Sequence, residues 1–181
     1  MSKHSRDELI QSFIAAVRAS QTATEMLDDA VANYLGIHST DYRCLDILDQ
    51  DGPMTAGRLA ERARISPGAT TALLDRLERK GLARRTRDTE DRRRVLVEVT
   101  PELRQRAEQL YGTPEEGAQG LAGYTDEELE FLTAFLRGSV AYQEERMRRL
   151  EALEAREAAT EPSPLSGEAT AGSNPADDLA G

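Results

Sequence analysis

The chain has 181 residues and carries 23 Lys and Arg against 33 Asp and Glu, which gives a formal net charge of −10. A hydrophobic content of 39% with 31% charged residues is typical of a soluble globular protein and excludes a fibrous one. No apolar run approaches the roughly 20 residues of a membrane-spanning helix, so no membrane partner is expected. The single cysteine excludes an intramolecular disulfide and predicts a cytoplasmic location.

The charge is unevenly distributed along the chain. Residues 52–100 carry 12 basic and 7 acidic side chains, a net charge of +5, whereas 1–51, 101–150 and 151–181 are net −5, −4 and −6. The overall charge argues against a nucleic-acid partner, but the basic middle segment reverses that argument locally. Residues 52–100 are therefore the first place to look for a functional surface.

The first part of the chain predicts a long helix followed by a short one. Apolar residues recur at intervals of three and four over 6–35, which indicates an amphipathic helix. Ser5 and Glu8 form a capping box at its start. The shorter helix is expected to begin with a cap at Ser39 or Thr40.

Two short helices joined by a tight turn are expected next. Thr55 can cap a helix near 56–63, and Ser66 with Pro67 forms an N-cap followed by proline for a helix that ends near Lys80. The residues expected on the buried face of this last helix are Ala69, Ala72, Leu73 and Leu77.

A β-hairpin follows this pair of helices. Residues 82–86 and 95–100 are β-prone, and the polar segment 87–93 between them is expected to form a charged tip. Two short helices followed by a hairpin form a winged helix-turn-helix. The predicted fold class is therefore mainly α with a small β-hairpin wing (α+β).

The last part of the chain predicts helices and then an unstructured end. Residues 101–111 are helical in pattern, and the glycine-rich segment 112–124 indicates a weak or broken helical region. Thr125 lies in a second capping box that opens a long helix over 126–156. Residues 161–181 contain mainly Pro, Gly, Ser, Ala and acidic residues, which predicts a disordered acidic tail.

Four short motifs between residues 59 and 100 are shared with a known protein family. They are Leu59–Arg62, Ser66–Thr71, Leu74–Arg85, and Asp91–Arg93 followed by Val95–Thr100. The pattern resembles the multiple-antibiotic-resistance regulator (MarR) family of dimeric bacterial transcription factors. The resemblance extends over about residues 8–153.

The resemblance implies a single MarR-like domain, without cofactor or enzymatic activity, that acts as a homodimer on double-stranded DNA. Its implied parts are dimerisation helices at about 6–35 and 126–156, a DNA-binding lobe at about 40–100, a recognition helix at about 66–80 and a wing at about 82–100, all within 1–160. By the same likeness, Arg93 is the wing arginine that reaches the minor groove, and Asp91 is its orienting partner.

The candidate DNA contacts combine a helix N-terminus rich in small residues with arginines further along. A small-residue N-terminus can enter the major groove closely, and its free N–H groups can bind a phosphate. Arginines at a hairpin tip can enter the minor groove, where the negative potential is strong. The candidate residues are Ser66, Pro67, Gly68, Thr70, Thr71, Arg76, Arg84, Arg87, Arg92 and Arg93.

Adjacent arginines on the first strand of the hairpin are expected to play different roles. Because Arg84 and Arg85 alternate on this strand, one is expected to point to the DNA backbone while the other forms an internal ion pair. Asp75 is expected to be the internal partner of a nearby arginine rather than a reader of bases.

Other candidate sites are few. His38 can line a ligand pocket with Tyr34 and Tyr42, or it can cap a turn, and the sequence leaves both open. Cys44 is expected to be a small buried hydrophobic residue. The histidines and acidic residues show no metal-ligand spacing, and no catalytic constellation can be assigned.

Together these observations predict a homodimeric transcriptional regulator, in particular a ligand-responsive repressor that binds a pseudo-palindromic operator. Many members of the family bind small phenolic or anionic ligands, so a small-molecule effector is left open by the resemblance. The alternative is a winged-helix protein–protein adaptor without specific DNA binding, which the acidic flanks favour.

Overall fold

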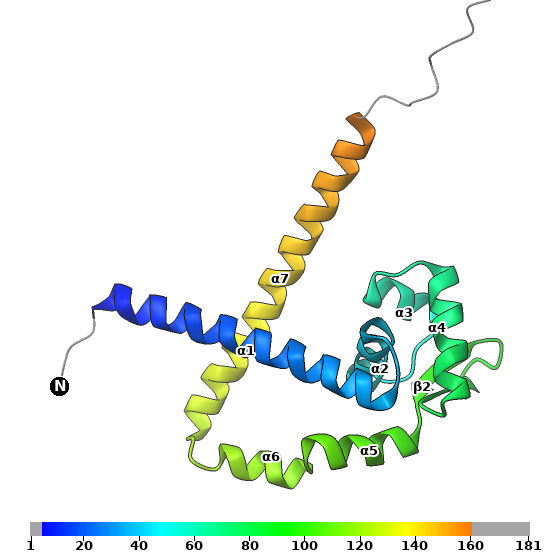
Figure 1. Ribbon diagram of the computed structural model, residues 1–181, viewed down its shortest axis with the longest axis horizontal. Coiled ribbons are helices and arrows are strands. Elements are labelled where there is room, and N and C mark those ends of the chain that lie inside the picture. The colour runs from blue at the N-terminus through cyan, green and yellow to red at the C-terminus, as the bar shows by residue number, and fades with distance from the viewer. Residues whose placement is uncertain (1–4, 161–181) are drawn as a thin grey trace, which may run out of the picture. The chain divides into compact units, whose positions relative to one another are not determined.

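The fold is mainly helical and carries one β-hairpin (Figure 1). The computed structural model describes residues 5–160, and the chain divides into two units, residues 1–120 and 121–181. The elements are α1 (Arg6–Leu35), α2 (Ser39–Asp51), α3 (Ala56–Ala63), α4 (Pro67–Arg79), β1 (Ala83–Arg87), β2 (Val95–Val99), α5 (Pro101–Tyr111), α6 (Pro114–Leu121) and α7 (Asp126–Thr160). The predicted disordered tail, residues 161–181, lies outside the described residues.

Helix α1 begins and ends where its capping residues predict. The Ser5 side chain accepts a hydrogen bond from the Glu8 N–H, and the Glu8 carboxylate accepts one from the Ser5 N–H, so the capping box is confirmed. Gly36 ends the helix in the left-handed conformation, with φ of 64°, which a residue without Cβ adopts at little cost. The buried residues of this helix are Val31 and Ala32, both near its C-terminus.

Helix α2 begins one residue earlier than a cap at Ser39 or Thr40 would allow. His38 is the N-cap, without a side-chain hydrogen bond to the helix. The Ser39 hydroxyl instead donates to Asp29 on α1, at 2.6 Å. The predicted cap was wrong because this hydroxyl is bound by a residue ten positions away in the chain.

The hydrophobic core lies among α2, α3, α4 and the hairpin. Leu48, Leu59, Leu74 and Val97 are almost completely buried there, one from each of these elements. Cys44 is fully buried in the same core, as predicted, and burial raises the pKa of its thiol to about 11. Figure 1 shows α3, α4 and the hairpin gathered around α2, which places α4 at the surface of this lobe.

Helix α4 buries a different face from the predicted one. Ala69 and Ala72 are exposed, and Leu73 and Leu77 are buried as predicted. The rest of the buried face is Thr70 and Leu74. Thr70 can be buried because its hydroxyl donates to the Ser66 carbonyl of the same helix, at 3.0 Å. The exposed face of α4 is therefore formed by Gly68, Thr71, Ala72, Asp75 and Arg79.

The two strands of the hairpin are antiparallel, and one further residue pairs with β2. Ala83 pairs with Val99 at one end and Arg87 with Val95 at the other. Met54, between α2 and α3, forms an isolated bridge with Val97, with N–O distances of 3.1 and 2.7 Å in the two directions. This bridge was not predicted, because a single residue after Pro53 carries no strand pattern. It attaches the wing to the helix-turn-helix.

The C-terminal helices follow the predicted interruption. Gly112 ends α5, and the segment 112–124 contains one short helix, α6, so it is broken but not irregular throughout. Thr125 and Glu128 form the predicted capping box of α7, which runs a little further than 156. Among the helices of residues 5–160, none combines the length and the apolar character that crossing a membrane requires.

Candidate nucleic-acid interface

The turn between α3 and α4 is set by local caps. Thr55 caps α3 by accepting from the Arg58 N–H at 3.3 Å. Arg64 then adopts the left-handed conformation, with φ of 55°, and reverses the chain. The Ser66 hydroxyl accepts from the Ala69 N–H at 3.3 Å, and Pro67 occupies the first turn of α4. The result is a helix-turn-helix in which the N-terminus of α4 is exposed.

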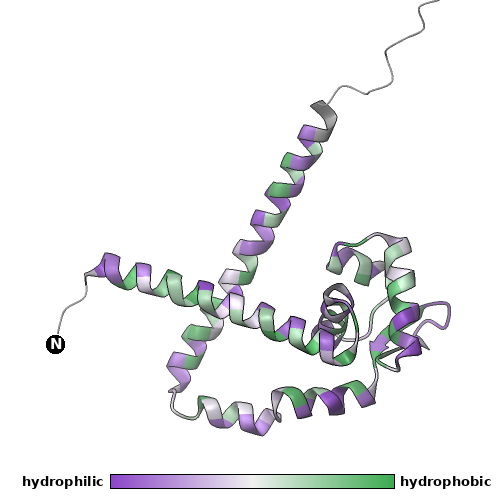
Figure 2. Ribbon diagram, viewed as in Figure 1, coloured by the Kyte–Doolittle hydropathy of each residue, from purple (hydrophilic) through white to green (hydrophobic). Residues whose placement is uncertain are grey.

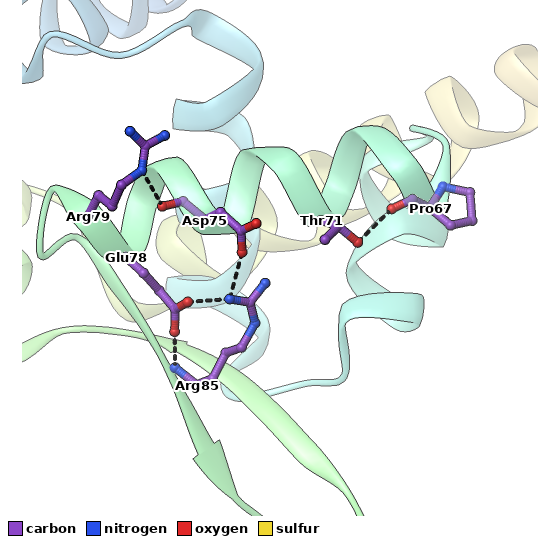
Figure 3. Close-up of polar contacts among 6 residues, drawn as sticks. All are labelled: Pro67, Thr71, Asp75, Glu78, Arg79 and Arg85. Atoms are coloured by element: carbon purple, nitrogen blue, oxygen red, sulfur yellow. Dashed lines mark hydrogen bonds and ion pairs between the residues drawn. The ribbon is translucent and has the colours of Figure 1, made fainter.

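Most predicted contacts at this N-terminus are exposed, but one is not. Ser66, Pro67 and Gly68 are exposed, as is Thr71, whose hydroxyl donates to the Pro67 carbonyl at 3.1 Å (Figure 3). Thr70 is only 1% exposed, so it cannot contact DNA and its assignment is corrected. The exposed face around Thr71 has only small side chains, which allows a close approach to a groove.

The second half of α4 is tied to the wing by Arg85. Its Nη1 donates to Asp75 Oδ1 at 2.9 Å and also to Glu78, and its backbone N–H donates to Glu78 Oε1 at 2.9 Å (Figure 3). The prediction that Asp75 partners a nearby arginine is confirmed. The other contact at Asp75 is to its backbone carbonyl, which accepts from Arg79 Nε at 3.2 Å. This network fixes the orientation of the hairpin on α4.

Arg76 is held by an ion pair to the core of the lobe. Its Nη2 and Nε donate to Asp41 Oδ1 and Oδ2 at 2.7 and 3.2 Å, in a bidentate pair. Asp41, on α2, is 2% exposed and the Arg76 side chain is 39% exposed, so the pair links α4 to α2 at the edge of the core. Sequence reasoning missed Asp41, because nothing local distinguishes it from the other aspartates of α2. Because its guanidinium is already held by Asp41, Arg76 is not among the DNA contacts proposed below.

Arg84 is also paired within the chain. It lies opposite Glu98 in the hairpin register, and its Nε donates to Glu98 Oε1 at 2.9 Å. The expectation that only one of Arg84 and Arg85 forms an ion pair was wrong, since both do. Cross-strand opposition explains the first pair and the proximity of α4 explains the second.

The hairpin tip presents arginines without such partners. Arg87, Arg92 and Arg93 are exposed, and the ion pairs described within residues 5–160 do not include them. Asp91 Oδ1 accepts from the backbone N–H of Arg93 at 3.0 Å, so it holds the main chain of the tip. Asp88 pairs with Arg94 at 3.6 Å and steadies the other side. These two contacts stabilise the turn at the tip, from which Arg87, Arg92 and Arg93 are exposed.

A cavity of about 420 Å³ lies in the same unit, between α1, α2 and α5. Tyr42 lines it together with Tyr111, and their hydroxyls are 2.5 Å apart. Tyr34 and His38, which the sequence grouped with Tyr42, are not among its lining residues, and Tyr34 is 71% exposed. Tyr111 was missed because it lies 69 positions from Tyr42 in the chain.

A helix-turn-helix joined to a basic hairpin defines the winged helix-turn-helix class of proteins. The MarR family model matches residues 37–95. The uncharacterized HTH-type transcriptional regulator YcgE of Bacillus subtilis is 36% identical over 149 residues, which cover 82% of this chain and 97% of YcgE. The chain therefore belongs to the MarR family of transcriptional regulators. This agrees with the expectation that it is not an enzyme.

Two further relatives are informative. The HTH-type transcriptional repressor MdtR of B. subtilis is 31% identical over 100 residues, which cover 54% of this chain and 63% of MdtR. A solved structure of a MarR family protein from Bacillus stearothermophilus is 20% identical, has a TM-score of 0.53, and covers 77% of this chain and 99% of its own. At this identity the structural likeness concerns the fold.

Proposed function

We propose that the protein is a homodimeric, ligand-responsive repressor that binds a pseudo-palindromic operator. The observation that carries the proposal is the presence of two exposed features on one lobe: the small-residue face of α4 and the three arginines Arg87, Arg92 and Arg93 of the hairpin tip. Both lie in the one segment of the chain with a net positive charge.

The proposed DNA contacts divide between the two grooves. Gly68, Thr71 and Ala72 face the major groove, where small side chains and a threonine methyl can contact thymine methyl groups. The backbone N–H groups of Ser66 and Gly68, at the N-terminus of α4, face a phosphate, in the way that helix N-termini bind anions. The tip arginines Arg87, Arg92 and Arg93 reach the adjacent minor groove.

The exposed apolar residues of the long helices support the homodimer. On α1, Leu9, Ile10, Phe13 and Ile14 are each more than 40% exposed. On α7 the apolar positions recur between polar ones (Figure 2). The exposed large apolar residues of α7 are Phe131, Leu132, Leu136, Val140, Tyr142, Met147, Leu150 and Leu153. Such extended apolar faces mark interaction surfaces, and a symmetric dimer would cover them with the same faces of a second copy.

A two-fold dimer predicts the form of the operator. Each protomer would present one α4 to one half-site, and half-sites would be about one helical turn, roughly 34–36 Å, apart. The direction of regulation is taken from likeness, since MdtR is named a repressor. Ligand response would follow if an effector favours an α4 spacing that no longer fits the operator.

A mobility-shift titration tests the proposal. The full chain is titrated against the DNA upstream of its own gene at several salt concentrations, and its mass is measured by light scattering. We expect a dimer whose log affinity falls linearly with log salt concentration. Arg106→Ala, an exposed arginine on α5, is the control for loss of one positive charge outside the lobe. A monomer, or an affinity that ignores salt, would contradict the proposal and favour the adaptor alternative.

A further inference from the structure

The cavity between α1, α2 and α5 has the size of a small-molecule site. Its volume of about 420 Å³ lies within the roughly 300–1,000 Å³ of ligand pockets. One part of its wall is apolar and includes Leu27, Val31 and Leu45. Tyr42 and Tyr111 add two aromatic rings. Such a wall suits a ligand with a compact apolar body.

The charge of the remaining wall is negative. Asp28, Asp46 and Asp49 line the cavity, and Arg104 is the basic residue among its lining. Arg104 is already paired with Asp49, at 3.4 Å. Asp46 accepts a hydrogen bond from the neutral amide of Gln50, at 2.8 Å. Two carboxylates of the wall are thus left without a positive counterpart in the described ion pairs.

Asp28 is the carboxylate whose charged form the surroundings disfavour. It is partly buried on α1, and the ion pairs described for residues 5–160 do not include it. Its pKa is raised by burial first, and then by the nearby carboxylates of Asp46, Asp29 and Glu25. A positive charge placed in the cavity would relieve this repulsion, whereas a second negative charge would add to it.

The arrangement favours an organic cation over a metal ion. Within the described part of the chain, no group of three or more His, Cys, Asp or Glu side chains is placed to hold a metal. The two carboxylates share the wall with the apolar side chains and the two tyrosine rings named above. A cation with diffuse charge can also lie against the rings of Tyr42 and Tyr111, since aromatic faces attract cations.

We propose that this cavity binds an organic cation with a compact apolar body, whose charge faces Asp28 and Asp46. The proposal rests on the proposed function as a ligand-responsive regulator and replaces the phenolic or anionic ligand that family resemblance implies. The hydrogen bond between the hydroxyls of Tyr42 and Tyr111 joins α2 to α5 at this cavity. A bound cation therefore contacts the helix that supports α4 through Asp41.

A pair of probes with the same shape and opposite charge tests this directly. Binding of tetraphenylphosphonium and of tetraphenylborate to the full chain is measured by isothermal titration calorimetry without DNA. We expect the cation to bind at least tenfold more tightly than the anion. Asp28→Asn and Asp46→Asn should each weaken cation binding at least threefold, and together more. Glu61→Gln, an exposed acidic residue on α3 outside the cavity lining, is the matched control and should change nothing.

The outcomes separate this inference from the proposed function. Anion binding as tight as cation binding, absence of cation binding, or cation affinity unchanged in both aspartate variants would overturn the cation site. Because Asp28→Asn removes a repulsion, it should not unfold the chain, and a melting curve confirms that lost binding is local. DNA binding by the unliganded chain, measured separately, would stand if only the cation site fails. Cation binding without any DNA binding would support the site and contradict the repressor.

Discussion

Six arginines of the winged lobe form two groups with the same charge and different surroundings. Three of them, on α4 and β1, are each held by a carboxylate: Arg76 by Asp41, Arg84 by Glu98, and Arg85 by Asp75 and Glu78. Those at the hairpin tip, Arg87, Arg92 and Arg93, are exposed and outside the described ion pairs. The first group stabilises the lobe, and the second is available to a polyanion.

This division shows why a basic segment is an incomplete guide to a DNA surface. A paired arginine and its carboxylate are together neutral, so the pair displaces few of the counterions that surround DNA. An unpaired arginine keeps its full charge. Position in the fold, through strand register and helix packing, decides to which group each arginine belongs. The following predictions test the division, beginning with the largest expected effect.

Arg76→Ala should cause the largest loss of stability. It leaves the buried Asp41 carboxylate without its partner, and removing one partner of a fully buried pair costs roughly 3–5 kcal/mol. Because the Arg76 side chain is 39% exposed, water screens the pair and we expect the loss to fall below that range. Urea denaturation measures it, with Arg79→Ala on the same helix as a control that should stay within about 0.5 kcal/mol. If Arg76→Ala left the free energy of unfolding unchanged, this arginine would belong with the tip group.

Ala72→Leu should separate the proposed DNA binding of α4 from the stability of the fold. Ala72 is exposed on the small-residue face, so we expect a change in unfolding free energy within about 0.5 kcal/mol. The larger side chain should hold α4 away from the groove and weaken operator binding at least tenfold. Ala118→Leu, at an exposed position of α6, is the control for added bulk. A loss of several kcal/mol of stability would place Ala72 in the core and contradict the face described above.

Asp28→Asn should have the smallest effect on stability, and its sign depends on pH. The pKa of Asp28 is raised above its usual 3.8, so the ionised group destabilises the folded state at neutral pH. That penalty is present above the folded pKa and disappears below about 3.8, where Asp28 is protonated whether folded or unfolded. The variant should melt slightly higher than the parent at pH 7, within about 0.5 kcal/mol, and at the same temperature in acid. A variant that melts lower at pH 7 would show that Asp28 has a stabilising partner.

Much of the fold could be predicted because its signals are local. The capping residues Ser5, Thr55, Ser66 and Thr125 mark helix starts that the structure confirms. The buried face of α4 was misjudged because counting apolar residues favours alanine over threonine. Thr70 is buried all the same, since its hydroxyl is bound within its own helix.

The candidate site could be predicted only in part, because ion pairing is a tertiary property. The Arg84–Glu98 pair requires the hairpin register, and the Arg76–Asp41 pair joins residues 35 positions apart. The cavity is similar, since Tyr42 and Tyr111 meet only when α5 packs beside α2. Residue type therefore predicted the basic lobe, while the three-dimensional contacts distinguish the arginines held by carboxylates from the exposed arginines of the tip.

The salt dependence of operator binding in two charge-matched variants tests this distinction most directly. Arg93→Ala and Arg84→Ala each remove one arginine from the same hairpin, and Arg84 contacts Glu98 across the strands rather than α4. Each positive charge that no longer neutralises a phosphate lowers the slope of log affinity against log salt by about 0.9. We predict that the tip variant, Arg93→Ala, loses about 0.9 units of slope, while the strand variant, Arg84→Ala, keeps the parental slope. An equal or larger loss of slope in the strand variant would contradict the account.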